Sequence, residues 1–543
     1  MLSIESDPTH LTAMQTNDKF RDECGVFGVW GNADAVAHTL VGLTALQHRG
    51  QDSSGIAVTQ GSQIHRVCRA GRTIHLVSDD EVRALQGHSA IGHVRYSTVG
   101  DSRLANAQPI VLNCPQGDIA ICHNGQIVNF QDLKQELSNI GATWQSDSDT
   151  ELVLQLCAMS KHSMIMDAIL ETLSLLQGAF ALLLLVNSEL IAARDRHGFR
   201  PLCLGRLNEG FVVCSETCAL DAVGACYLRE IEPGEVLAIG DAGITSRRYS
   251  SSLERAHCIF EHVYFARPDS HVFGENVGGV RTRLGRNLAR ESPADADVIV
   301  PVPDSGMWVG LGYQEESGLP LRLGLVRNNY VGRMFIEPAA NRSKSNTKLK
   351  LNPVPAILAG QRVVLVDDSI VRGETMTRIV AAVREAGAIE VHVRIGCPPT
   401  IAPCYYGINT PTKAELIAAR CSVEEIRRQI GADSLHYLSF EGLLDSMGDA
   451  RSNYCTACYT GYYRVCPPHI GQTIQQSGPS RDQKGIAVSE KQHGMHTTDH
   501  LPHIAAKSGL LGFNHEAISA TETACGVNHS GKPALADVLN KPV

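Results

Sequence analysis

Three features that would direct attention to nucleic acids, membranes or export are missing from the sequence. Basic residues are not in excess, because 48 Lys and Arg stand against 57 Asp and Glu and give a net charge of −9 at pH 7. General binding to nucleic acid or to an anionic membrane usually requires basic runs. No apolar run approaches the ~20 residues that cross a bilayer, since the most apolar, Ala181–Val186, has the length of a strand. The first residues lack a basic start followed by an apolar segment, so no secretory signal is predicted. We expect a soluble, cytoplasmic protein with neither nucleic acid nor membrane as a partner.

The sequence also lacks an internal repeat, so its 543 residues are expected to divide among unlike domains. Residues 24–249 alternate short β-like runs, such as Gly25–Trp30, with turns and two helix-like stretches, which indicates an α+β sandwich. Residues 250–470 contain buried parallel-type strands and a βαβ unit, in which the helix Thr375–Ala386 leads to the strand Glu390–Ile395; this predicts an α/β domain with a parallel sheet. Further on, Ser422 and Glu425 form a capping box that predicts a helix toward Ile430. Residues 471–543 are rich in Ser, Gly, Gln, His and Lys and are predicted to be disordered, apart from a possible short helix over His515–Thr521.

Cysteine, by contrast, is abundant, with 17 residues in the chain. A disulfide framework is not expected in a protein of this size without an export signal. Most of these cysteines are therefore predicted to be small buried hydrophobic residues. A few are expected to act chemically, as a nucleophile or as metal ligands.

The first candidate is Cys24, which begins the strand-like segment CGVFGVWG. Taken alone, a cysteine at the head of a strand is usually inert core packing. Further polar groups follow apolar runs in four other segments: LQHRGQDSSG, GHVRYST, HNG and SDTE. Such groups converge readily at one edge of a sheet. On their own, Arg95 and Asp149 suit a surface ion pair, and Asn124–Gly125 suits a hairpin turn.

Together these segments resemble the glutaminase domain of the N-terminal-nucleophile amidotransferases, which form an αββα sandwich. The resemblance implies that a propeptide, residues 1–23, is cleaved and that Cys24 becomes the N-terminal residue. A free α-amine has a pKa of about 7.7–8.0 and serves as the general base beside the thiol. By the same resemblance, Asn124 and the N–H of Gly125 form an oxyanion hole. Arg95 and Asp149 bind the α-carboxylate and α-ammonium of glutamine.

The second candidate site lies in RVVLVDDSIVRGET, where an apolar strand ends in Asp367–Asp368. The loop that follows carries Ser369, Gly373 and Thr375 and leads into a helix, an arrangement that presents backbone N–H groups to phosphate. Paired acids at a strand end suit ribose hydroxyls or hydrated Mg²⁺. A solvated helix start is the alternative interpretation.

The complete pattern resembles the phosphoribosyl pyrophosphate (PRPP) motif of type I phosphoribosyltransferases. That resemblance implies that Ser305, in VPVPDSG, lies near one Mg²⁺ per subunit together with Asp367 and Asp368. It also implies that Arg333, in NNYVGRMFIEP, belongs to a mobile loop over the substrate. Tyr264, in YFARPDS, matches a position beside the phosphoribosyl group.

A glutaminase followed by a phosphoribosyltransferase is the architecture of the amidophosphoribosyltransferase family, which residues 24–469 resemble. The resemblance implies that ammonia from glutamine passes internally to C1 of PRPP and displaces pyrophosphate. The product is 5-phosphoribosylamine, in the first committed step of purine synthesis. Feedback inhibition by purine nucleotides and a homotetramer are also implied.

A third candidate site begins at the C-x₂-C pair of Cys455 and Cys458. Such a pair suits a redox motif, half of a zinc site or part of an iron–sulfur site. One subclass of the family holds one [4Fe–4S] cluster per subunit, and the matching ligands are these two residues with Cys258 and Cys404. Cys397 and Cys466 are close in sequence and are alternative ligands.

Two other functions stay open at this stage. An amidotransferase that aminates a sugar phosphate shares the first domain, but the segment VDDSIVRGET disfavours it. A non-catalytic nucleotide sensor is disfavoured by the joint presence of the residues expected at both catalytic sites.

Overall fold

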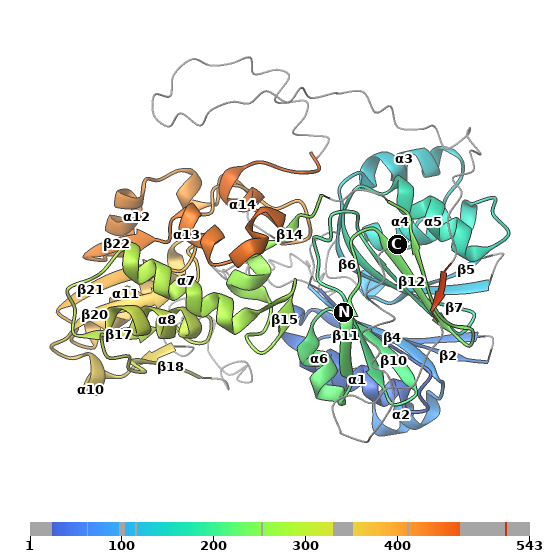
Figure 1. Ribbon diagram of the computed structural model, residues 1–543, viewed down its shortest axis with the longest axis horizontal. Helices are drawn as coiled ribbons and strands as arrows, with labels where there is room; N and C mark the ends of the chain where they lie inside the picture. The colour runs from blue at the N-terminus through green and yellow to red at the C-terminus, as the bar shows by residue number, and fades with distance from the viewer. Residues whose placement is uncertain are drawn as a thin grey trace, which may run out of the picture.

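The computed structural model describes residues 24–61, 63–96, 104–114, 117–250, 254–328, 351–409, 412–466 and 516–518. The expected propeptide, Arg333 and most of the expected tail lie outside these residues. The chain forms two bodies that lie side by side, one built from residues 25–248 with Glu516–Ile518 and the other from residues 257–460 (Figure 1).

The first body contains two seven-stranded sheets in which every neighbouring pair of strands is antiparallel. The first sheet, in the order β11-β9-β10-β1-β4-β2-β3, contains β1 (Gly25–Trp30), β2 (Ser53–Gln60), β3 (Gln63–Ala70), β4 (Ser89–Arg95), β9 (Cys203–Leu207), β10 (Gly210–Cys214) and β11 (Cys226–Glu230). The second, in the order β24-β13-β12-β8-β7-β6-β5, contains β5 (Ile110–Cys114), β6 (Gly117–Ile127), β7 (Gly178–Val186), β8 (Glu189–Arg194), β12 (Glu235–Gly240), β13 (Gly243–Arg248) and β24 (Glu516–Ile518).

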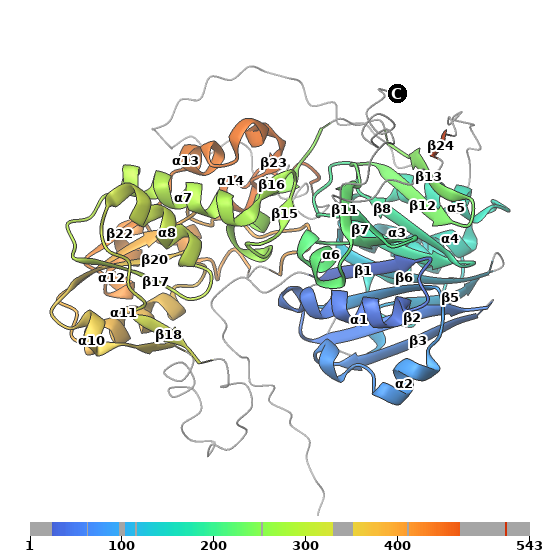
Figure 2. The ribbon, with the colours of Figure 1, turned by 60° about the horizontal axis from the view of Figure 1, so that its bottom comes forward.

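Helices cover the outer faces of these two sheets (Figure 2). The first sheet is covered by α1 (Ala35–Ala45), α2 (Asp79–Ala84) and α6 (Thr217–Val223), and the second by α3 (Phe130–Asn139), α4 (Asp149–Met159) and α5 (Ile165–Leu175). Between the sheets, small and branched apolar side chains such as Val26, Ile91 and Leu183 form a common core. This layering is the predicted αββα sandwich.

The second body is built on a four-stranded parallel sheet. Its strands, in spatial order, are β17 (Val298–Pro301), β20 (Arg362–Asp367), β21 (Glu390–Ile395) and β22 (Ser434–Tyr437). The main helices are α7 (Val277–Glu291), α8 (Met307–Ser317), α11 (Glu374–Glu385), α12 (Val423–Ile430) and α13 (Phe440–Asp445). The shorter elements are α10 (Pro355–Leu358), α14 (Ala457–Thr460), β14 (His257–Cys258), β15 (His271–Val272), β16 (Glu275–Asn276), β18 (Leu325–Arg327), β19 (Leu351–Pro353) and β23 (Tyr454–Cys455).

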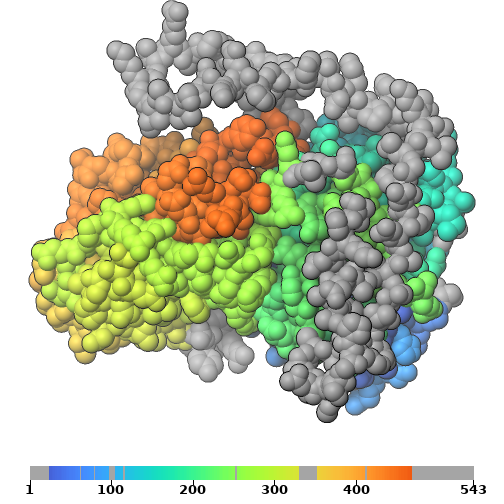
Figure 3. Space-filling model, in the orientation of Figure 1, coloured from blue at the N-terminus to red at the C-terminus, as the bar shows by residue number. Residues whose placement is uncertain are grey.

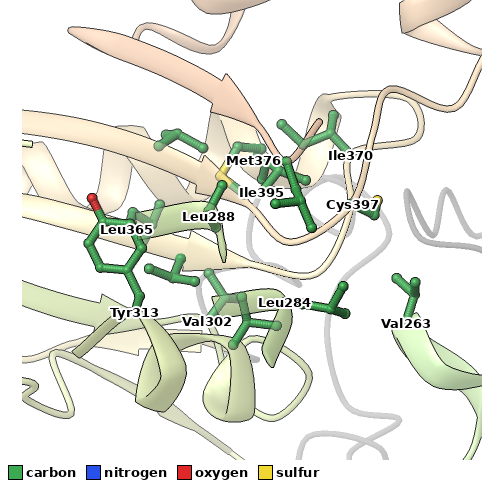
Figure 4. Packing of buried hydrophobic residues seen from close by; sticks show 14 of the residues in the cluster. Val263, Leu284, Leu288, Val302, Tyr313, Leu365, Ile370, Met376, Ile395 and Cys397 are labelled. Atoms are coloured by element: carbon green, nitrogen blue, oxygen red, sulfur yellow. The ribbon is translucent and has the colours of Figure 1, made fainter. Parts of the chain in front are cut away.

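Apolar side chains pack on both faces of the parallel sheet (Figure 4). Leu365 of β20, Ile395 of β21, Leu288 of α7 and Met376 of α11 belong to one cluster, and all four are buried. Full burial of a side chain of this size stabilises the fold by roughly 1.5–3 kcal/mol. Two-sided burial explains why β17 and β20 have nearly continuous apolar sequences, and it confirms the predicted α/β domain.

The helix expected over His515–Thr521 is wrong, because Glu516–Ile518 forms β24 and pairs with the edge strand β13. Three other predicted element boundaries are confirmed. Strands Gly25–Trp30 and Glu390–Ile395 have the expected bounds, and α12 begins at the expected capping box of Ser422 and Glu425.

Candidate functional sites

Cys24 and Arg95 lie at the same end of two paired strands. Gly25 of β1 is in register with Val94 of β4, so the residues flanking this pair meet at one edge of the first sheet. Both side chains are buried, and the Cys24 thiol lies 3.5 Å from the carbonyl oxygen of Tyr96. The expected nucleophile and the expected carboxylate-binding arginine are therefore brought together.

Asn124 and Gly125 lie on β6 of the second sheet, which contacts both β1 and β4. The Asn124 side chain is 1% exposed, and its Nδ2 has no hydrogen-bond partner among the described residues. Gly125 has a φ of +140°, and a Cβ added there would lie 2.1 Å from the carbonyl oxygen of Ala179. A buried amide donor without a partner is costly, so its retention suits a group that meets its acceptor only during the reaction.

His93 joins the two sheets at this site. Its Nε2 donates to the carbonyl oxygen of His123 at 3.0 Å, which ties β4 to the residue before Asn124. Burial lowers the pKa of His93 to about 3, so the imidazole stays neutral. Its role was missed at the sequence level, although it stands in the quoted segment GHVRYST.

Asp149 is the first residue of α4, directly after the N-cap residue Ser148. The carboxylate is buried, and its Oδ2 accepts the backbone N–H of Ile127 at 2.9 Å. Its Oδ1 lies 3.6 Å from Nδ1 of His123. Asp149 is thus held beside the end of β6, near Asn124, as a ligand for an ammonium group would be.

A buried ionic network that the sequence analysis did not predict connects this site to the second body. Arg49 donates to the carbonyl oxygen of Cys24 at 3.0 Å and forms ion pairs with Glu216 and Glu261 at 2.5 and 2.6 Å. Burial alone would raise the pKa of Glu216, but the charges of His48 and Arg49 hold it well below its ordinary value. The available sequence signal was a glutamate inside each of two apolar segments, VVCSETCAL and CIFEHVYF.

The second site lies at the carboxyl ends of β17 and β20. Asp367 Oδ1 accepts the backbone N–H of Asp368 at 2.9 Å and the hydroxyl of Ser305 at 3.3 Å. Ser369 donates its hydroxyl to the Asp368 carboxylate. The expected metal-binding residues from two separate loops therefore meet, with both aspartates and Ser369 buried.

The loop after these acids leads into a helix, as predicted. Gly373 is the N-cap residue of α11, and Thr375 lies in its first turn. The 12-residue helix directs its first backbone N–H groups toward the side of the sheet where Asp367 and Asp368 lie. This is a suitable position for a phosphate group.

Tyr264 lies in a π-helix, Glu261–Phe265, a rare element that often occurs at functional sites. The buried Arg281 holds this turn, since it donates to the carbonyl oxygens of His262 and Ala266, each at 2.8 Å. Burial lowers the pKa of Arg281 to about 10, and the charge of Asp368 opposes this shift. The π-helix is thereby linked electrostatically to the acids of the second site.

The four expected cluster ligands gather near the boundary of the two bodies. Strands β14 and β23 are parallel, with Cys258 in register with Cys455, and Cys458 follows in α14. Burial raises the pKa of Cys458, and the nearby thiols of Cys455, Cys258, Cys404 and Cys397 raise it further. Cys397 therefore remains a neighbour of the group, whereas Cys466 is exposed. Four neighbouring thiols are the number of donors that a [4Fe–4S] cluster requires, although no three of them lie close enough here to hold a single metal ion.

Within the described ranges, no three His, Cys, Asp or Glu side chains stand close enough to hold one metal ion. The same part of the chain contains no helix both long and apolar enough to cross a membrane.

Comparison with known proteins decides the family. A family model described as a glutamine amidotransferase domain matches residues 93–222. The amidophosphoribosyltransferase of Bacillus subtilis is 47% identical over 464 residues, which cover 83% of this chain and 98% of the relative. The chain belongs to the amidophosphoribosyltransferase family. A member from Methanocaldococcus jannaschii is 46% identical over 459 residues, covering 81% of this chain and 97% of that relative.

Solved structures of amidophosphoribosyltransferases agree with the fold. The glutamine PRPP amidotransferase from B. subtilis complexed with ADP and GMP has a TM-score of 0.77 at 46% identity, covering 82% of this chain and 100% of that chain. The predicted fold and enzyme class are confirmed. The expected reaction is confirmed as well: the glutamine-dependent conversion of PRPP to 5-phosphoribosylamine, which is the first committed step of purine synthesis.

Proposed function

We propose that Cys24 and the residues around it hydrolyse glutamine, and that the site at Asp367 and Asp368 uses the ammonia. The observation that carries the first half is the buried Asn124 amide, whose Nδ2 lacks a partner among the residues described. The tetrahedral intermediate formed at a glutamine carbonyl supplies the missing acceptor, and Gly125 N–H is the second donor.

The proposed chemistry begins once removal of residues 1–23 frees the α-amine of Cys24. The thiol loses its proton to that amine and attacks the side-chain amide carbon of glutamine. The amine then passes the proton to the departing nitrogen, which leaves as ammonia, and water hydrolyses the thioester to glutamate. The Arg49 bond to the Cys24 carbonyl fixes the main chain of the nucleophile during these steps.

Substrate selection follows from the two ends of free glutamine. Arg95 pairs with the α-carboxylate and Asp149 with the α-ammonium. Asp149 is suited to this role because the N–H of Ile127 and the Ser148 cap fix its position.

In the second body, Asp367, Asp368, Ser369, Gly373 and Thr375 bind PRPP through its ribose and phosphate groups. Tyr264 lies beside the phosphoribosyl group, and Arg333 closes over the pyrophosphate. Asp367 and Asp368 with Ser305 would hold one Mg²⁺ per subunit, which would supply positive charge beside the pyrophosphate. The contact of Ser305 with Asp367 supports this donor set.

Cys258, Cys404, Cys455 and Cys458 hold one [4Fe–4S] cluster per subunit. The cluster is structural or oxygen-sensing, because the transfer of ammonia requires no electron. Anaerobically purified protein should show iron, sulfide and broad visible absorbance. Purified protein that contains zinc, or no metal, would rule out the [4Fe–4S] cluster.

Regulation, assembly and location complete the proposal. Purine nucleotides act as feedback inhibitors, which the B. subtilis structure with ADP and GMP supports for a relative of 46% identity. The chain assembles as a homotetramer in the cytoplasm. Its domain limits are residues 1–23, 24–249, 250–470 and 471–543.

The function is tested by measuring glutamate and pyrophosphate released in the presence of glutamine and PRPP. N-terminal sequencing of the active protein should give Cys24 as the first residue. An active enzyme that retains Met1 would contradict the proposed general base.

A further inference from the structure

A loop of the second body lies directly against the proposed oxyanion hole. Gly407 has a φ of +104°, and a Cβ added there would lie 2.8 Å from both Cα and C of Gly125 and 3.0 Å from its oxygen. The backbone of Gly125 therefore lies close to both Ala179 of β7 and Gly407. Figure 1 shows the two bodies side by side, and Figure 3 shows their surfaces in contact.

The residue before Gly407 is held by a buried arginine of the first body. The guanidinium of Arg200 donates twice to the carbonyl oxygen of Tyr406, from Nε at 3.0 Å and from Nη2 at 2.5 Å. Its Nη1 lies 3.6 Å from the Glu261 carboxylate, and all three side chains are buried. A buried arginine is costly unless it is paired, and two hydrogen bonds from it to the Tyr406 carbonyl fix the position of that residue.

The ring of Tyr406 is held as firmly as its backbone. Phe199 stacks on it with a centroid distance of 4.2 Å. The Tyr406 hydroxyl donates to the carbonyl oxygen of Val465 at 2.9 Å and accepts the N–H of the same residue at 2.9 Å. Its backbone N–H donates to the sulfur of Cys404 at 3.3 Å. The loop is thus rigid at Tyr406 and presents Gly407 at a defined distance from Gly125.

The direction of the Gly125 N–H determines whether the oxyanion is stabilised, because donors must lie about 2.7–3.1 Å from the position that this oxygen will occupy. We infer that Gly407 is a positioning residue for the glutaminase reaction, supplied by the phosphoribosyltransferase body, and that Arg200 holds it in place through Tyr406. This inference rests on the proposed role of Gly125.

The principal test is Gly407→Ala, with Gly431→Ala as a matched control. Both glycines have positive φ, +104° and +74°, but a Cβ at Gly431 meets nothing within 4 Å in the described part of the chain. Both substitutions place an alanine at a positive φ, which strains the backbone. Only Gly407→Ala also places a Cβ against Gly125. We expect Gly407→Ala to lower the kcat for glutamine hydrolysis about 10- to 100-fold, less than complete loss of a donor. The control should retain wild-type kcat.

Three further readouts separate positioning from general damage. In Gly407→Ala the KM for glutamine, the ammonia-dependent synthesis and the rate of Cys24 alkylation by iodoacetamide should stay near their wild-type values, since none of them requires an oxyanion donor. If ammonia-dependent synthesis and Cys24 alkylation fall in parallel with glutamine hydrolysis, the inference is overturned. It is also overturned if the kcat for glutamine hydrolysis equals that of the Gly431→Ala control.

Arg200→Lys is the second variant, in case Gly407→Ala does not fold. It keeps a cation near Glu261 but loses the two-pronged bond to Tyr406, so the kcat for glutamine should fall while ammonia-dependent synthesis persists. An unchanged kcat for glutamine hydrolysis would overturn the inference.

Asn124→Ala separates a failure of this inference from a failure of the proposed function. If that variant keeps full glutaminase activity, the oxyanion hole itself is wrongly assigned. If it loses activity while Gly407→Ala does not, only the positioning role fails.

Discussion

Asn124→Ala is expected to separate catalysis from stability in the first body. The Nδ2 group is buried and has no partner within the described ranges, so the folded protein gains no hydrogen bond from it. Removing one oxyanion donor lowers kcat by about 10²–10³, equivalent to about 2.7–4 kcal/mol of transition-state stabilisation. Removing an unsatisfied buried donor also relieves a desolvation cost of about 1–3 kcal/mol, which offsets the lost packing. The free energy of unfolding should therefore change by less than about 1 kcal/mol.

Asn129→Ala is the matched control, because Asn129 is a buried asparagine whose amide nitrogen and oxygen are both hydrogen-bonded. Its Nδ2 donates to the carbonyl oxygen of Leu175 and its Oδ1 accepts the N–H of Gln177, both at 2.9 Å. Truncation removes both bonds and leaves both partners without them, which costs roughly 2–4 kcal/mol. Glutaminase kcat should stay within a few-fold of wild type.

Steady-state glutaminase kinetics and denaturant unfolding, applied to both variants, measure the two effects. The expected pattern is a large fall in kcat without instability for Asn124→Ala, and the reverse for Asn129→Ala. An Asn124→Ala variant as destabilised as Asn129→Ala, or one with a kcat within threefold of wild type, would refute the reasoning.

Two further predictions concern the second site and the buried histidines. Asp368→Asn should lower pyrophosphate release by roughly 10- to 100-fold with either glutamine or ammonia as nitrogen donor, while Cys24 alkylation persists; synthesis retained with ammonia would contradict its role. Burial lowers the pKa of three histidines to about 3: His93, His257 and His262. Because the unfolded chain protonates them near pH 6.5 and the folded protein does not, stability is unaffected by them above pH 6.5 and falls below it. The expected loss is about 1.4 kcal/mol per pH unit for each histidine down to about pH 3. Denaturant unfolding between pH 7 and 4.5 measures it, and a flat profile would contradict the buried neutral state.

The sequence was most informative where one physical pattern determines the structure. Strand Glu390–Ile395 was predicted with its observed bounds because its sequence, EVHVRI, alternates polar and apolar residues as a strand does and lies between the turn-forming residues Gly387 and Gly396. The α12 boundary was predictable because Ser422 and Glu425 satisfy each other's backbone N–H groups locally.

The sequence was least informative where a residue acts through a distant partner. Glu261 and Arg200 stand 61 positions apart and meet only after the two bodies dock, so no local spacing reveals their pairing. The same holds for Gly407 and Gly125, whose contact depends on the approach of two backbones. The helix expected over His515–Thr521 failed for a related reason, because pairing with β13 outweighs a weak local preference.

Family resemblance supplied the roles that geometry alone does not assign. Residues expected from it converge at both sites: Cys24 with Arg95 at one sheet edge, and Ser305 with Asp367 at another.

The central claim is that two separable sites cooperate, one releasing ammonia at Cys24 and the other using it at PRPP. The most direct measurement compares pyrophosphate release by Cys24→Ser with glutamine and with free ammonia. We predict that the variant loses the glutamine-dependent reaction and keeps the ammonia-dependent one at close to the wild-type rate. Loss of both reactions in a correctly folded variant, or retention of the glutamine-dependent one, would contradict the account.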